Sequence, residues 1–147
     1  MFDFQRGFAL FLASTAIAGL ATVATAGAAH AACPTDQFGK FVGGYGNVVT
    51  NASGRVIYRS TMTLSANGVV FETTGSASAR GNWVIDRRTC YPLITSRDTR
   101  TGSISNYYVL EVEWEDSTQS RAEVMEGTVR ASVGGVPMTR NVTSTRG

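Results

Sequence analysis

Histidine and lysine are nearly absent from this chain of 147 residues, which contains His30, Lys40 and no other copy of either. His30 lies in an N-terminal segment that we expect to be removed, and the remaining chain would then have no histidine. That excludes Ser-His-Asp triads, a histidine general base and histidine-ligated metals. The sequence also lacks a Gly-x-Ser-x-Gly elbow, a glycine-rich phosphate loop and a Ser-x-x-Lys motif around Lys40. We therefore expect no catalytic motif and no cofactor.

The N-terminal segment predicts export. After Arg6 the chain runs without charge from Gly7 to Ala29, which is the layout of a secretory signal. Ala29-His30-Ala31 offers small residues at −3 and −1, so we expect residues 1–31 to be a signal peptide and residues 32–147 to be one domain. A retained membrane anchor is the alternative, but its second half is rich in Ala, Gly and Thr and therefore weakly apolar. The predicted location is periplasmic or secreted, with no stable membrane anchor after cleavage.

Cysteine is scarce as well, with Cys33 and Cys90 as the two copies. An exported protein folds where disulfides persist, so we expect these two residues to pair. A redox or metal role lacks the close CxxC spacing. Cys33 also raises the possibility of a lipoprotein, but His30 stands where the lipidation motif has an aliphatic residue. Removing Asp3 and Arg6 would leave 12 basic and 10 acidic residues. The resulting net charge is too small to predict a nucleic-acid partner.

Apolar residues alternate with polar ones in short runs, and no convincing helical period is present after the signal. From Arg55 to Ser65 one face is apolar and the other polar, and Ala66-Asn67-Gly68 is typical of a tight hairpin leading into 69–73. We expect a connection over Gly75–Ala79, a strand over 80–86, and a strand over 90–94 in which Pro92 lies at an edge or a bulge.

The second half of the chain predicts another hairpin. One face combines Tyr108, Leu110, Val112 and Trp114, and a turn over 116–119 would place Val112 opposite Val124 and Glu115 opposite Arg121. The apolar positions then change phase, so we expect a bulge near 125–127. A turn at 134–135 would lead into the last strand.

With a first strand between Phe38 and Thr50, these segments make about eight strands joined by short turns. An up-and-down meander of this size removes its edges by closing, so the predicted fold class is all-β, a small antiparallel barrel. A two-sheet β-sandwich is the alternative.

The stretch Thr61-Met62-Thr63-Leu64, Ala66-Asn67-Gly68, Val69-Val70-Phe71 and Gly81-Asn82-Trp83 resembles the small lipocalin-like (calycin-type) barrels of bacterial envelope proteins. The usual lipocalin layout places Gly-x-Trp in the first strand, where this chain has Phe41-Val42-Gly43-Gly44-Tyr45-Gly46. The resemblance therefore implies an architecture and a general binding role, and no ligand-binding residue is carried over.

Candidate site residues fall into two groups. The carboxylates Glu111, Glu113, Glu115 and Glu123 suggest a calcium site or an acid pair, although charged residues on a wet strand face usually keep a hairpin soluble. Aromatic residues suggest a pocket, with Trp83, Trp114 and Tyr58 either lining it or filling the core. Tyr107 and Val109 lie on the wet face and predict a partner-binding patch.

Three functions are consistent with these observations. The first is a non-enzymatic binding protein of the bacterial envelope that takes a small apolar ligand or a protein partner. The second is a secreted inhibitor of a foreign hydrolase, a protease or lysozyme, using the loops 75–80 and 97–103. The third is an enzyme that uses carboxylates alone.

Overall fold

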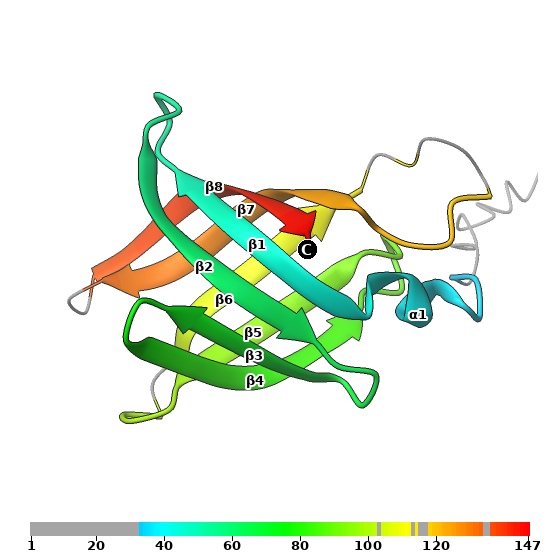
Figure 1. The fold of residues 1–147 in the computed structure, drawn as a ribbon, viewed down its shortest axis with the longest axis horizontal. Helices are drawn as coiled ribbons and strands as arrows, with labels where there is room; N and C mark the ends of the chain where they lie inside the picture. Colours follow the sequence, from blue (N-terminus) through cyan, green and yellow to red (C-terminus); the bar gives the residue numbers. More distant parts are fainter. Residues whose placement is uncertain (1–32, 103, 113, 115–117, 134–135) are drawn as a thin grey trace, which may run out of the picture.

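The computed structural model describes residues 33–102, 104–112, 114, 118–133 and 136–147. One short helix precedes eight strands (Figure 1). In chain order the elements are α1 (Gln37–Phe41), β1 (Gly43–Thr50), β2 (Val56–Leu64), β3 (Val69–Thr74), β4 (Ala77–Ile85), β5 (Pro92–Asp98), β6 (Ile104–Glu111), β7 (Val124–Val133) and β8 (Val136–Arg146).

The eight strands form a closed antiparallel barrel in which each strand pairs with its sequence neighbour. Closure comes from β1 and β8, where Tyr45 lies opposite Arg146 and Thr50 lies opposite Asn141. A closed ladder leaves no unpaired strand edge. The predicted eight-stranded up-and-down barrel is confirmed, and the sandwich alternative is not adopted.

Alternation of side chains places the core inside this barrel, as the sequence predicts for β2. Met62 and Leu64 are buried there, whereas Arg59, Thr61 and Thr63 face outward. The tight hairpin at 66–68 also forms as expected. The Ser65 amide donates to the Val69 carbonyl, and Gly68 adopts a φ of 79° that favours glycine.

The helix α1 lies at one end of the barrel (Figure 1). Its residues Phe38 and Phe41 pack there with the apolar core. Phe41 is fully buried, and the Phe38 ring stacks on Trp83 with the ring centroids 3.9 Å apart. The Trp83 indole donates to the Ser65 carbonyl at 3.0 Å. This end of the barrel is therefore a packed aromatic core.

The predicted disulfide is confirmed. Cys33 and Cys90 are bonded, with their Cα atoms 5.3 Å apart, and the bridge joins the segment before α1 to the turn between β4 and β5. Gln37 adds a second tie, because its amide donates to the Cys90 carbonyl at 2.7 Å. Both contacts hold α1 against the barrel end. Pro92 is the first residue of β5, a position that tolerates the lack of an amide donor, and it does not lie at the predicted edge or bulge.

Arg146 fixes the same end from the other terminus. Its guanidinium donates to the carbonyls of Lys40, Val42 and Ala122 and to the Tyr45 hydroxyl, at distances between 2.8 and 3.0 Å. A planar guanidinium with five donors suits such a set of convergent acceptors. The last strand is thereby tied to the segment that enters β1.

Several sequence predictions are wrong in detail. A helix, α1, forms where none was expected, and β4 begins at Ala77 inside the predicted connection 75–79, so the candidate loop 75–80 is largely strand. β6 and β7 form the predicted antiparallel pair, but its predicted register is wrong, and residues 115–117 of the predicted turn lie outside the described residues. Glu111 ends β6 and pairs with Glu126, while Val124 is exposed and pairs with Thr145 of β8.

The predicted change of parity between the buried positions before and after residue 124 is present, but it does not come from a bulge. Ala122 is buried, but it precedes β7, in which Met125 and Val129 are the inward residues. The last described β6–β7 pair is Glu111 with Glu126, and the described β7 pairs show no register shift, so the predicted bulge at 125–127 is not found. The predicted Glu115 partner of Arg121 and the turn at 134–135 lie outside the described residues.

Candidate functional site

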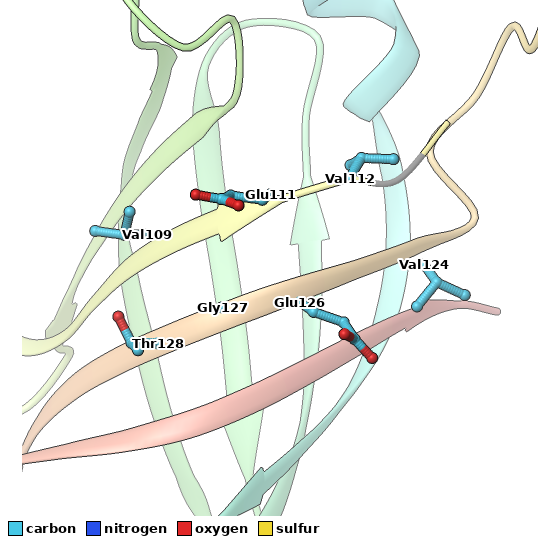
Figure 2. Close-up of a pocket in the computed structure, with 7 residues that line it drawn as sticks. All are labelled: Val109, Glu111, Val112, Val124, Glu126, Gly127 and Thr128. Atoms are coloured by element: carbon cyan, nitrogen blue, oxygen red, sulfur yellow. The ribbon is translucent and has the colours of Figure 1, made fainter. Parts of the chain in front are cut away.

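A pocket of about 770 Å³ lies on the outer face of the barrel where β6 and β7 run side by side (Figure 2). We call it the β6–β7 groove. It is lined by Val109, Glu111, Val112, Val124, Glu126, Gly127 and Thr128. Val109 and Glu111 are predicted on this face by the alternation in β6, whereas the contribution of β7 is not predicted by the sequence.

Strand alternation explains why these side chains face outward. On β6, Tyr108 and Leu110 point into the core, which leaves Val109 and Glu111 exposed. On β7 the inward residues are Met125 and Val129, which leaves Val124, Glu126 and Thr128 exposed between and beside them. The groove is thus formed by the outward-facing side chains of two neighbouring strands, β6 and β7.

Gly127 brings the two strands close together at the groove. A Cβ atom at this position would lie 2.1 Å from the Val109 carbonyl oxygen, so only glycine permits this approach. Gly127 pairs with Leu110, one step from the end of β6. Gly127 has the parity of the inward residues Met125 and Val129, so it lines the groove with its backbone alone.

The groove contains two exposed valines on the outer barrel face. Val109 is 41% exposed and Val124 is 44% exposed, and Tyr107, two residues before Val109, is 38% exposed. Outward strand positions normally carry polar residues. Tyr107 and Val109 are successive outward positions of β6, and exposed apolar side chains side by side on such a face are typical of a binding surface.

Two carboxylates lie across the groove from each other. Glu111 on β6 and Glu126 on β7 are directly paired in the ladder, and both side chains are exposed. Like charges directly opposite on a sheet destabilise the pairing. No described residue forms a recorded ion pair with either carboxylate. This arrangement favours a cationic group as an external partner.

A second polar cluster lies inside the barrel around Glu72, whose side chain is 1% exposed. Oε1 of Glu72 accepts hydrogen bonds from Ser60 at 2.8 Å and from Tyr108, and Oε2 accepts from Asn106 at 2.8 Å and from Ser96 at 3.3 Å. These donors come from β2, β5 and β6. The carboxylate therefore has four partners and links four strands.

The interior cluster continues toward β1 and β8. Asn47 donates to Ser60 at 3.1 Å, but its Oδ1 atom and the hydroxyl of Ser144 are buried without a partner among the described residues. Asn47 and Ser144 are opposite one another in the ladder. Buried polar atoms of this kind usually bind an ordered water molecule.

The electrostatics of the interior favour neutral phenols. Burial, and then the nearby charge of Glu72, raise the pKa of Tyr58 to about 12. The same two causes raise the pKa of Tyr108 well above its ordinary range. Both hydroxyls stay protonated at neutral pH, so they can donate hydrogen bonds but cannot act as a base there.

The interior cluster has little free space beside it. A pocket of about 100 Å³ at the barrel end remote from α1 is lined by Glu72, Thr74, Ala77, Ser78, Ala79, Asp98 and Asn106. This volume accommodates a few water molecules rather than an apolar ligand of ordinary size. Glu72 is thus a structural anchor in a nearly filled interior.

The structure separates the predicted aromatic residues. Trp83 is buried in the α1 end of the barrel, Tyr58 lies in the interior near Glu72, and Trp114 contacts Phe41 edge to face with centroids 5.9 Å apart. Trp114 also lies under the Lys40 ammonium, 5.2 Å from its ring centre. These three residues do not form one pocket, whereas Tyr107 and Val109 do share the outer face.

No metal site emerges from the described part of the chain, which contains no group of three His, Cys, Asp or Glu side chains able to hold an ion. Glu111 and Glu123 are exposed. Glu113 and Glu115 of the predicted carboxylate group lie outside the described residues. None of the helices in the described ranges is long and apolar enough to cross a membrane.

Comparison with family models, with curated proteins and with solved structures found no match for this chain.

Proposed function

We propose that this chain is a non-enzymatic binding protein of the bacterial envelope, and that its barrel is a rigid scaffold for a protein partner held in the β6–β7 groove. The single observation that carries this proposal is the apolar groove between Val109 and Val124 with an unrelieved carboxylate pair across it. The closed eight-stranded antiparallel barrel is consistent with a lipocalin-like fold, and the disulfide is consistent with an oxidising compartment.

The groove favours a partner segment in which apolar side chains alternate with lysine or arginine. Val109 and Val124 would pack against the apolar residues. A cation between Glu111 and Glu126 would relieve their repulsion, which the free protein cannot do. The barrel ladder beneath the groove is already ordered, so binding would not require the scaffold to fold.

A small apolar ligand inside the barrel is less well supported than a partner held in the β6–β7 groove. The interior half near α1 is filled by buried side chains such as Trp83 and Phe41, and the other half contains the Glu72 cluster. The pocket that reaches Glu72 measures about 100 Å³. Space and polarity therefore both argue for the outer surface.

A peptide array tests the proposal. The array should carry extended segments that alternate valine or leucine with lysine, together with matched segments in which glutamate replaces lysine. We expect the protein to bind the lysine set and not the glutamate set. Glu126→Gln should weaken binding about tenfold, a change that corresponds to one charge-assisted contact.

Two controls separate binding from folding. Glu126→Gln should raise the unfolding free energy by a few tenths of a kcal/mol, because it relieves repulsion with Glu111. Val109→Ser should weaken peptide binding, while Val56→Ser, at a similarly exposed site on β2, should not. Equal binding of both peptide sets, or equal effects of the two serine variants, would refute the proposal.

A further inference from the structure

A second pocket, of about 620 Å³, lies beside α1 and the disulfide. We call it the α1 cleft. It is lined by Cys33, Pro34, Thr35, Gln37, Phe38, Ile85, Arg87 and Arg88. It shares no lining residue with the β6–β7 groove.

The floor of the α1 cleft is apolar and held in place. Phe38 and Ile85 are half-buried and pack against the barrel core, and the Phe38 ring is stacked on Trp83 with planes 11° apart. The disulfide and the Gln37 hydrogen bond to Cys90 fix the helix that carries Phe38. A flat aromatic surface is therefore presented without further ordering.

The wall of the α1 cleft is cationic. Arg88 lies 3.5 Å from the Asp86 carboxylate, whose Oδ1 atom also accepts from the Arg88 amide. Arg87 is exposed and has no recorded ion-pair partner within the described residues. The remaining nearby acid, Asp36, lies 4.0 Å from Lys40. Arg87 thus contributes a positive charge that no neighbouring carboxylate offsets.

We infer that the α1 cleft binds a small organic anion with an apolar body, such as a carboxylate or sulfonate attached to an aromatic or aliphatic group. The apolar body packs on Phe38 and Ile85, and the anionic head pairs with Arg87, whose guanidinium presents a planar fork of donors. This site is independent of the proposed partner surface.

The test uses two fluorescent probes that differ in charge. 1-Anilinonaphthalene-8-sulfonate has the aromatic body and an anionic head, and N-phenyl-1-naphthylamine has a closely similar body without the sulfonate. We expect the sulfonate probe to bind at one site, to accept energy from tryptophan, and to bind less tightly as salt is added. Octanoate should displace it, and octanol should displace it less well.

Variants assign the binding to the cleft. Arg87→Gln should weaken the sulfonate probe about fivefold, as expected for loss of one half-exposed ion pair, and should leave the neutral probe unchanged. Arg59→Gln, an exposed arginine on β2, is the matched control and should change neither. Phe38→Leu should weaken both probes. If Arg87→Gln and Arg59→Gln bind the sulfonate probe equally, the inference is overturned, whatever the peptide array shows.

Discussion

Tyr108 donates a hydrogen bond to the carboxylate of Glu72 in the barrel interior. Both side chains are almost completely buried, and Glu72 has no recorded ion-pair partner among the described residues. A buried carboxylate without a cation depends entirely on neutral donors. Here those donors come from three other strands, so the pair belongs to a network that holds the barrel wall together.

Replacing Glu72 should therefore destabilise the fold. In Glu72→Gln an amide NH2 group replaces one carboxylate oxygen, and it cannot accept the hydrogen bonds that two donors now make with that oxygen. We therefore expect the unfolding free energy to fall by about 2–4 kcal/mol. Chemical denaturation measures the change. Glu123→Gln, at an exposed carboxylate, should cost less than about 0.5 kcal/mol. Equal stability of the two variants would show that the interior network contributes nothing.

Alkaline pH should destabilise the protein through Tyr58. Its pKa is raised from 10 to about 12, so between these values the unfolded chain loses a proton that the folded chain retains. The stabilisation is complete below pH 10 and is lost as the pH rises toward 12, at about 1.4 kcal/mol per pH unit. Unfolding free energies measured across this window should fall less steeply for Tyr58→Phe. Parallel curves for the two proteins would contradict the assignment.

Arg146 should be sensitive to replacement by lysine. Lysine keeps the charge but cannot reach the carbonyls of Lys40, Val42 and Ala122 together. We expect Arg146→Lys to lower the unfolding free energy by about 2 kcal/mol. Arg59→Lys, on the exposed face of β2, serves as the control and should be nearly neutral. A neutral Arg146→Lys would mean that charge alone matters at this end.

Two glycines of the barrel wall, Gly81 on β4 and Gly44 on β1, should respond in opposite ways. A Cβ at Gly81 would lie 1.8 Å from the Thr95 carbonyl oxygen, whereas a Cβ at Gly44 would meet nothing within 4 Å. Gly81→Ala should therefore cost about 3 kcal/mol or more. Gly44→Ala should change the melting temperature little or raise it slightly. Similar melting temperatures for the two variants would exclude the close approach of β4 and β5.

The disulfide should contribute substantially to stability. Its two cysteines are 57 residues apart, and the chain-entropy model gives roughly 4 kcal/mol for a loop of that length. A Cys33→Ser, Cys90→Ser double variant should unfold at lower denaturant concentration by the corresponding amount. Reduced wild-type protein should match the double variant. A reduced protein as stable as the oxidised one would rule out this contribution.

Much of the fold follows from alternation along the chain. From Tyr58 to Leu64 the apolar positions of β2 share one parity, so this part of the strand, its inward face and its hairpin at 66–68 were predictable, whereas Val56, expected on the same face, is exposed. Pairing of Cys33 with Cys90 followed from their number and the expected compartment. The helix α1 was not predictable, because five residues are too few for a helical period to show and its position depends on tertiary contacts.

The candidate sites were only partly predictable. In β3 apolar residues occupy both parities, with Phe71 exposed and Val70 buried, so alternation did not reveal that Glu72 points inward. Tyr107 and Val109 were found because they interrupt a polar face. The β7 half of the groove was missed because Val124 shares parity with buried Ala122, although Val124 itself is exposed and pairs with Thr145 of β8.

The pairing of β1 with β8 has a consequence for how the molecule folds. These strands are the first and the last of the ladder, so the seam between them forms only after the intervening chain is in place. Until then, β1 and β8 each present an unpaired edge on which another chain can add. Bringing together two strands that lie so far apart in the chain has a high entropic cost, and the β1–β8 pairing therefore forms slowly. The interval before the seam closes is therefore the period in which this protein is most exposed to aggregation.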